Sequence, residues 1–443
     1  MQEHAAAPIS PSGWLERFRG ADGARAKPYL DGIRAVAVLM IFVRHAWGHA
    51  GGLKLDLGLI DLTPGVAMFS TGVDLFFVLS GFLLARAYVA ADFAGRPRPD
   101  IRRYYTQRIL RIGPPYWVAL ALVLLAFTPW LIPAEEVYSP SGAIRVLVHA
   151  LFGQAVYLPT FGSWHVETPF WTLTVEMIFY LLLPALVVLF LRRRWLVSLP
   201  ISLAISLAWL YAVRYRWPGL VELLRVRTIQ GDFDVPFTRF FLSHTFPSYL
   251  FHFAVGLTVC NLVVRRERGV RLSPLFERLT SESMGAVWFV LGLGWSVYWL
   301  RANGSDALYG LYFEPRNYMR SESAATIRYY FCEGIPFAIG YGLILFGASV
   351  GPGWLRRPLS LPSLCFIGVI GYSVYLLHMP LLYLFQRMRF VTERAPYVHL
   401  AILWAAAGLV TLAVSTLFFV LVERPAMNAA KRLSAKEPAG DGG

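Results

Sequence analysis

The chain has few charged residues and few cysteines. Only 15% of its 443 residues are Asp, Glu, Lys or Arg, whereas 56% are hydrophobic, and its mean hydropathy is +0.52. A soluble protein of this length needs more polar residues to cover its surface, so a soluble globular fold is excluded. Cys260, Cys332 and Cys365 all lie in apolar stretches without metal-ligand spacing. They predict neither a disulfide framework nor a zinc site.

The sequence also lacks an internal repeat and any polar stretch long enough to fold as a separate soluble domain. Residues 1–28 are polar and rich in Ala, Pro and Gly, without the apolar core of a signal peptide. We expect them to form a disordered cytoplasmic N-terminus, and we expect residues 426–443 to form a disordered cytoplasmic tail. Residues 29–425 between them form one predicted transmembrane domain.

Positive charge is in excess, with a net charge of +14 at pH 7. Nucleic-acid binding would favour a basic chain, but here the arginines concentrate in short stretches between apolar segments. Such a distribution is typical of the cytoplasmic loops of membrane proteins. We therefore predict no nucleic-acid partner and place the basic loops in the cytoplasm.

Long apolar stretches recur along the chain and predict an all-α integral membrane protein. Most have near the ~20 residues that a helix needs to cross a bilayer. Residues 144–158 are too short to cross, and we expect an interfacial or re-entrant helix there. The fold is then a bundle of about ten transmembrane helices with both termini cytoplasmic. The predicted spans are 33–50, 66–89, 115–132, 170–191, 195–213, 246–264, 284–300, 329–350, 364–385 and 398–422.

The first predicted span carries two ionisable residues, Arg34 and His45, eleven positions apart. This spacing is about three helical turns, so both side chains share a face but lie about 16 Å apart along the axis. Ionisable residues are costly inside a membrane, which favours a functional role for both. His49 follows His45 by one turn, but no third ligand accompanies the pair, and we predict no metal site.

Ionisable side chains are expected in two layers. With the termini in the cytoplasm, His45, Asp74 and Glu176 lie about 7, 12 and 9 Å from the outer ends of their helices. We expect this outer layer to hold a histidine base and a carboxylate that orients it. Arginines at the cytoplasmic edge would supply positive charge for phosphates, although such arginines are also common as plain topology signals. They are Arg34, Arg102, Arg103, Arg108 and Arg111.

Several motifs, in order along the chain, resemble the membrane-bound acyltransferase family 3. YLDGIRAVAVLMIFVRHA holds Arg34 and His45 at that family's spacing of a basic residue, ten intervening residues and a histidine. GVDLFFVLSGFLL is similar to the second helix of the family, and RRYYTQRILRIGPPYW to its Arg-rich cytoplasmic loop. WTLTVEMIFYLLLP resembles its Trp-x-Leu-x-x-Glu motif, and GYSVYLLHMPL and VERP resemble its late motifs.

The resemblance implies an O-acyltransferase of the bacterial inner membrane, in contact with membrane lipids. Such an enzyme takes an acyl group, most often acetyl, from cytosolic acyl-coenzyme A (acyl-CoA) and needs no metal. It delivers this group to a hydroxyl of a cell-surface or lipid-linked saccharide such as lipopolysaccharide, or in some relatives to a macrolide. A transporter of acylated glycan or lipid is the rival interpretation, because it too would place charged residues along a path.

The resemblance also assigns roles to individual residues. It implies a reaction centre of His45, Glu176, Asp74 and Arg34, in which His45 is either a base or a transiently acylated intermediate. It assigns CoA binding to Arg108 and Arg111, and we also predict that Arg103 and Tyr116 bind CoA. We predict acceptor binding by Trp171, Arg44, His378 and Ser80; Arg44 departs from the family, because relatives usually have an apolar residue there.

Overall fold

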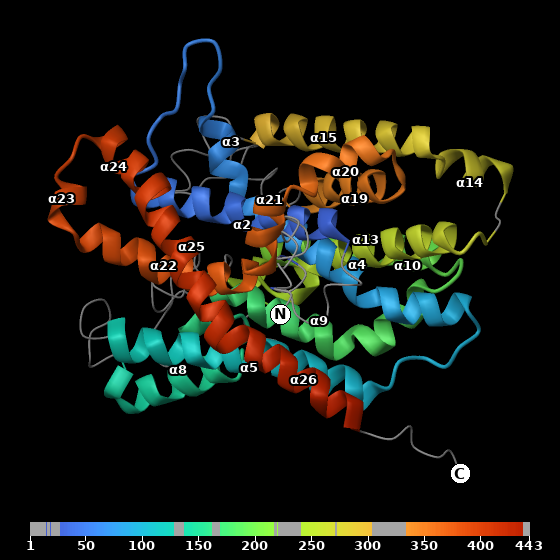
Figure 1. Cartoon of the computed structure of the whole chain (residues 1–443), viewed down its shortest axis with the longest axis horizontal. Coiled ribbons are helices and arrows are strands. Elements are labelled where there is room, and N and C mark those ends of the chain that lie inside the picture. Colours follow the sequence, from blue (N-terminus) through green and yellow to red (C-terminus); the bar gives the residue numbers. More distant parts are fainter. Residues whose placement is uncertain are drawn as a thin grey trace, which may run out of the picture.

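A computed structural model of the chain describes residues 27–127, 137–161, 169–216, 241–270, 273–303 and 334–436, with Leu15, Phe18 and Gly219. Over these residues the chain is helical apart from loops and one isolated bridge, so the predicted all-α class is confirmed (Figure 1). Of the predicted disordered segment 1–28, the structure describes Leu15, Phe18, Lys27 and Pro28, and Pro28 begins a helix. The main helices are α2 (Pro28–His49), α3 (Thr63–Ala67), α4 (Gly72–Phe93), α5 (Ile101–Leu122), α8 (Pro140–Ala150), α9 (Trp171–Leu186), α10 (Trp195–Tyr215), α13 (Phe246–Glu267), α14 (Pro274–Leu279), α15 (Glu282–Asn303), α19 (Gly334–Val350), α20 (Gly353–Leu359), α21 (Pro362–Val369), α22 (Gly371–Arg387), α23 (Arg389–Thr392), α24 (Pro396–Ile402), α25 (Gly408–Phe418) and α26 (Arg424–Lys436).

Several helices are long and apolar enough to cross a membrane. Seven pass by length and composition, or up to nine if α19 with α20 and α21 with α22, which bend by 115° and 73°, each count as one span. α2 is not among them; it carries Asp31, Arg34 and Arg44. Each predicted span has a helix as its counterpart, and α8, with 11 residues, is too short to cross. The multi-pass architecture is therefore supported, whereas the number of crossings and the side of the termini remain predictions.

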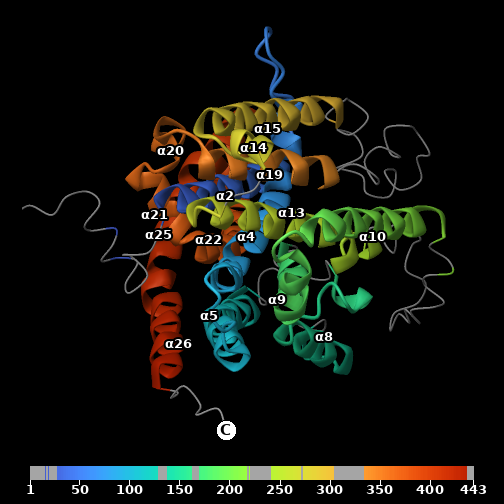
Figure 2. The ribbon, with the colours of Figure 1, turned by 90° about the vertical axis from the view of Figure 1, so that its right-hand side faces the viewer.

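α2 lies near the middle of the molecule, between α15 at one edge and α8 at the other (Figures 1 and 2). Glycines let neighbouring backbones approach it closely. A Cβ atom on Gly32 would lie 1.8 Å from the carbonyl oxygen of Leu359, and one on Gly368 would lie 1.9 Å from that of Asp31. These two positions therefore fix how α20 and α21 pack against α2, and any larger residue would push the helices apart.

α4 and α13 also pack through glycine. A Cβ atom on Gly81 would lie 2.4 Å from the carbonyl oxygen of Phe253, and one on Gly256 would lie 2.1 Å from that of Val78. Close backbone approach through small residues is typical of helix pairs in membranes, where burial of apolar surface gives little drive for association. This contact fixes the face of α4 that points away from α13, toward α9.

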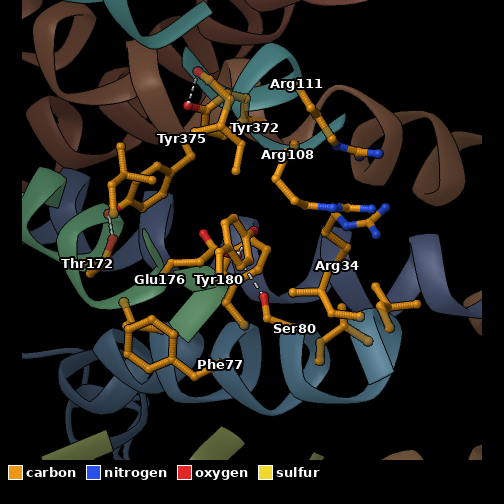
Figure 3. A pocket seen from close by; sticks show the side chains of 18 of the residues that line it. Arg34, Phe77, Ser80, Arg108, Arg111, Thr172, Glu176, Tyr180, Tyr372 and Tyr375 are labelled. Carbon is orange, nitrogen blue, oxygen red and sulfur yellow. Dashed lines mark hydrogen bonds between the residues drawn. The ribbon is translucent and has the colours of Figure 1, made fainter. Parts of the chain in front are cut away.

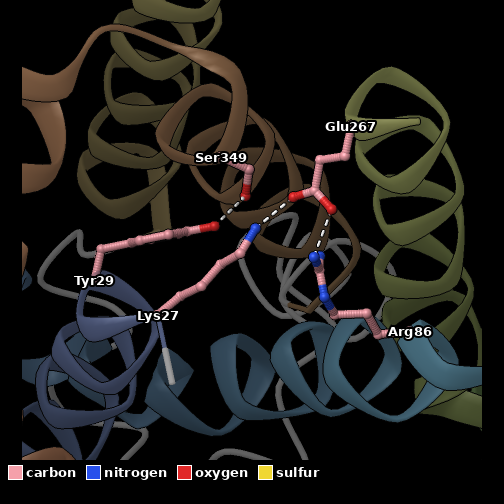
Figure 4. Close-up of polar contacts among 5 residues, drawn as sticks. All are labelled: Lys27, Tyr29, Arg86, Glu267 and Ser349. Atoms are coloured by element: carbon pink, nitrogen blue, oxygen red, sulfur yellow. Dashed lines mark hydrogen bonds and ion pairs between the residues drawn. The ribbon is translucent and has the colours of Figure 1, made fainter. Parts of the chain in front are cut away.

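An ion cluster joins three helices at one end of the bundle (Figure 4). Lys27, which precedes α2, donates to Oε1 of Glu267 on α13, and Arg86 on α4 donates to Oε2 at 2.5 Å. Tyr29 donates its hydroxyl proton to Ser349 Oγ at 3.2 Å, which adds α19 to the same end. We call Lys27, Arg86 and Glu267 the ion cluster.

Two segments that were predicted to be irregular are helical. The predicted Arg-rich loop is the first half of α5, and the Asp100 side chain caps this helix by accepting from the Arg103 backbone N–H at 2.6 Å. α26 extends to Lys436, into the stretch that was expected to be disordered. It lies alongside α5 (Figure 2), where Ala430 is buried, and this packing stabilises a helix that its polar residues alone would not predict. Residues 437–443 lie outside the described part of the chain.

Candidate active site

A cavity of about 290 Å³ opens between α2, α4, α5, α9 and α22. Apolar side chains of these helices form part of its wall, and charged and hydroxyl groups converge on the remainder (Figure 3). We call it the arginine cavity. Its polar lining includes Arg34, Ser80, Arg108, Arg111, Glu176, Tyr180, Tyr372, Tyr375 and Glu423.

The two carboxylates of the arginine cavity are held by hydroxyl groups. Oε1 of Glu176 accepts from Ser80 Oγ at 2.8 Å and from the Tyr180 hydroxyl at 2.5 Å. Glu423 is 1% exposed, and its Oε2 accepts from Ser373 Oγ at 2.6 Å. Hydrogen bonds from neutral donors satisfy these oxygens without cancelling their charge.

The arginines of the cavity form no ion pair with those carboxylates within the described residues. Arg34 forms an ion pair with Asp31 on its own helix, at 2.8 Å. Neither Arg108 nor Arg111 forms an ion pair within the described residues, and Nε of Arg108 is buried without a hydrogen-bond partner there. Figure 3 shows the three arginine side chains together on one side of the cavity. Arg108 and Arg111 are half-buried, and a buried guanidinium nitrogen without an acceptor is costly, so this arrangement favours an anionic ligand.

The geometry of α5 explains which of its basic residues reach the cavity. Arg108 and Arg111 are three positions apart and therefore share a helix face. Tyr104, one turn before Arg108, donates to the backbone carbonyl of Tyr180 at 3.1 Å and anchors α5 to α9. The helix turns that follow Arg111 are held to α22, because the Tyr372 hydroxyl donates to the Ile112 carbonyl at 3.0 Å.

Two of the four residues predicted to bind CoA lie elsewhere. Arg103 is exposed and does not line the arginine cavity, because it projects from another face of α5. Tyr116 is fully buried, donates its hydroxyl proton to the His149 carbonyl at 2.8 Å and accepts from Gln154. Tyr116 therefore holds α5 against α8, and its role in CoA binding stays a prediction.

His45 and His378 form a second constellation. Nδ1 of His45 lies 3.0 Å from Nε2 of His378, and the rings stack with centroids 5.1 Å apart. Nδ1 of His378 lies 2.7 Å from the Tyr375 carbonyl oxygen, which can only accept, so this nitrogen carries the proton. In the neutral state Nε2 of His378 then accepts from Nδ1–H of His45. The network leaves the lone pair of His45 on Nε2.

The predicted outer layer of His45, Asp74 and Glu176 does not exist as one cluster in the described structure. Glu176 lines the arginine cavity, and Oδ1 of Asp74 lies 2.8 Å from Nε2 of His252 on α13. The prediction used depth alone, whereas the rotation of each helix decides which residues meet. His378, predicted to bind the acceptor, instead occupies the position beside His45 that was assigned to a carboxylate.

The other residues predicted to bind the acceptor have mixed outcomes. Ser80 lines the arginine cavity. Arg44 is buried, donates from Nε to the Ala67 carbonyl at 3.0 Å and lies over the Trp47 ring, so packing accounts for its position. Trp171 packs edge-on against His244, with centroids 4.5 Å apart, and is not part of the cavity wall.

The sequence did not single out the tyrosines of the cavity or Glu423. Tyr375 connects the two constellations, since its ring lines the arginine cavity while its carbonyl holds His378. Its hydroxyl bonds to Thr172 Oγ1 and to the Pro169 carbonyl, which fixes the ring between α22 and α9. The sequence did contain a sign of two of them, because Tyr180 and Glu423 belong to motifs that carry the family resemblance. Among the described residues, no group of three His, Cys, Asp or Glu side chains is placed to hold a metal ion.

Comparisons with known proteins give the same family as the motifs. Residues 27–420 match the family described as an acyltransferase domain, acyltransferase family 3. Nodulation protein 10 of Rhizobium leguminosarum bv. viciae is 24% identical over 429 residues, which are 92% of this chain and 95% of that protein. No solved structure matches the chain.

Two further relatives have names that state a process. Peptidoglycan O-acetyltransferase OatA of Listeria monocytogenes is 23% identical over 409 residues, which are 90% of this chain but 55% of OatA. Exopolysaccharide production protein ExoZ of Rhizobium meliloti is 30% identical over 260 residues, which are 55% of this chain and 74% of ExoZ. The family match spans most of the chain, so this protein belongs to acyltransferase family 3 and is an acyltransferase.

Proposed function

We propose that this protein is an integral membrane O-acyltransferase that moves an acetyl group from acetyl-CoA to a hydroxyl of a cell-surface or lipid-linked saccharide. The observation that carries the proposal is the pair Arg108 and Arg111, which line the arginine cavity without ion-pair partners in the described chain. Phosphate oxygens are the strongest partners for guanidinium groups, and CoA carries several. The acceptor class is supported by the names of OatA and ExoZ.

The donor binds with its phosphates on Arg108 and Arg111, and Arg34 lies on the same side of the cavity. Arg34 is about 16 Å from His45 along α2, so the pantetheine arm must cover that distance for the thioester to reach the histidine. Tyr375 lies between the two constellations, and its ring forms part of the wall along this path.

At the histidine pair, Nε2 of His45 takes the proton of the acceptor hydroxyl. The hydroxyl oxygen then attacks the thioester carbonyl carbon, a C–O bond forms, the C–S bond breaks, and the CoA thiolate leaves and receives the proton. His378 Nε2 accepts from Nδ1–H of His45, so the lone pair on His45 Nε2 is free to take the proton of the acceptor hydroxyl. The enzyme would lie in a bacterial inner membrane, with its termini and its CoA entrance in the cytoplasm.

Transfer of labelled acetate from acetyl-CoA by the purified full-length protein tests this function. His45→Ala should lower kcat by about 10³-fold or more, because positioned acid–base groups contribute about 10²- to 10⁴-fold. Release of free CoA separates an acyltransferase from a transporter, which releases none. Full transfer by a normally folded His45→Ala protein would show that the mechanism is wrong.

A further inference from the structure

A second basic cavity lies at the turn between α9 and α10, apart from the arginine cavity. It is a groove of about 720 Å³, and it shares no lining residue with the arginine cavity. Its wall contains Arg192, Arg193, Arg194 and Arg265, together with Asp92 and Phe93. We call it the basic groove.

Positive charge in the basic groove exceeds what the described chain compensates. Its lining has one carboxylate, Asp92, which pairs with Arg192 through an Nε–Oδ2 distance of 3.2 Å. Arg194 donates to the Val188 carbonyl at 3.3 Å, whereas Arg193 has no ion pair within the described residues. Four guanidinium groups around one carboxylate repel one another unless an anion joins them.

Arg265 gives an independent sign of a missing partner. It lies in the last turn of α13 and is only 8% exposed, yet its Nε has no hydrogen-bond partner among the described residues. Its Cζ lies 5.7 Å from the centre of the Phe93 ring, which holds the guanidinium at the groove wall. A buried guanidinium nitrogen in this position lacks an acceptor that an anionic ligand would supply.

The surroundings of the groove indicate what carries the anion. Residues 191–194 connect two helices that are apolar enough to span a membrane, so the arginines lie at the level where the membrane meets water. α10 begins directly after these arginines, and its side chains Val197, Ile201 and Ile205, which recur every four residues, form an apolar stripe and are 64%, 52% and 44% exposed. A charged groove at the start of a helix that carries an exposed apolar stripe suits a molecule with an anionic head and apolar chains.

We propose that the basic groove binds an anionic phospholipid, with the phosphate between Arg193, Arg265 and Arg194 and the acyl chains along α10. A free phosphate or the phosphates of CoA would satisfy the arginines equally well, but neither would use the apolar stripe.

The test is native mass spectrometry of the full-length protein, delipidated in detergent and then titrated with phosphatidylglycerol, phosphatidylcholine, inorganic phosphate or CoA. The double variant R193Q/R265Q should lose about 10-fold or more in phosphatidylglycerol occupancy, since it removes two charge-assisted contacts. The matched control R278Q removes an exposed arginine of α14 and should bind like the wild type. Phosphatidylcholine binding should be equal in all three proteins.

A second variant keeps the proposal testable if Arg265 is needed for folding. D92N removes the one carboxylate that the described residues contribute to the groove lining and should raise phosphatidylglycerol occupancy, whereas R193Q alone, at an exposed side chain, should lower it about 3-fold. Wild-type occupancy in R193Q/R265Q, or in R193Q where the double variant does not fold, overturns the proposal. Displacement of the lipid by millimolar phosphate or CoA also overturns it, in favour of a soluble phosphate ligand. None of these readouts depends on acyl transfer, so the outcome is independent of the proposed function.

Discussion

The ion cluster and the arginine cavity both contain cations and carboxylates, but the carboxylates have different hydrogen-bond partners in the two regions. In the ion cluster, both oxygens of Glu267 are taken by cations from two other segments of the chain, Lys27 and Arg86. In the arginine cavity, Glu176 and Glu423 accept from hydroxyl groups, and Arg108 and Arg111 have no carboxylate partner in the described chain. The first arrangement is complete by itself, whereas we propose that a ligand completes the second.

The difference shows why arginine content alone does not identify a ligand site. Arg86 and Arg108 both lie at helix faces in the bundle, and each has a carboxylate in its neighbourhood. What separates them is whether the carboxylate is bonded to the cation or to a hydroxyl. Stability should therefore depend on the ion cluster, and donor affinity should depend on the arginine cavity.

Among the effects that separate these two regions, the largest is expected on the KM for acetyl-CoA. The double variant R108Q/R111Q should raise the KM for acetyl-CoA by about 100-fold or more, because each charge-assisted contact to a phosphate contributes about 1.5–3 kcal/mol. Its thermal midpoint in detergent should not fall, since two unpaired charges are removed. Steady-state acetyl transfer measures the first quantity, with R278Q as the matched exposed control. An unchanged KM in the folded double variant would place the CoA phosphates elsewhere.

A second expected effect is stabilisation by the donor product. Free CoA at about 100 times its Kd should stabilise the wild-type protein by about 2.7 kcal/mol, because it binds only the folded state. The shift of the thermal midpoint should disappear in R108Q/R111Q and persist in Glu267→Gln, where the arginine cavity is intact. Thermal scans with and without CoA distinguish the two regions directly; loss of the shift in Glu267→Gln would mean that the ion cluster also binds the ligand.

A smaller effect is expected at Glu176. Glu176→Gln keeps a carbonyl oxygen where Oε1 accepts from Ser80 and Tyr180, and it removes only the negative charge. Because this charge opposes the phosphates, the KM for acetyl-CoA should fall by about 3- to 10-fold, which is about 0.6–1.4 kcal/mol. Ser80→Ala, which keeps the charge and removes one hydrogen bond, is the control. A rise in KM for Glu176→Gln would mean that Glu176 holds the donor in place.

Much of the helical architecture could be predicted from the sequence, because a hydrophobic run of ~20 residues has few alternatives in a membrane. The convergence of Arg34, Arg108 and Arg111 on one cavity was also anticipated, since all three were placed in one layer by their depth. Depth alone did not predict the neighbours of Glu176 and Asp74. Glu176 lines the arginine cavity, and Asp74 contacts His252. Helix rotation is set by contacts such as Gly81 against Phe253, and a single sequence does not report which helices meet.

The smallest expected effect is at the ion cluster itself. Lys27, Arg86 and Glu267 have side chains that are about one-third exposed, at 34%, 30% and 34%, so water screens their attraction. Glu267→Gln should therefore cost about 1 kcal/mol or less and lower the thermal midpoint by a few degrees. The KM and kcat for acetyl transfer should stay at wild-type values, because the cluster shares no residue with the arginine cavity.

Glu277→Gln, at an exposed glutamate of α14 without an ion pair in the described chain, is the matched control. A change in the KM for acetyl-CoA without a change in the thermal midpoint would contradict these roles. It would mean that Glu267, the carboxylate bonded to two cations, contributes to donor binding.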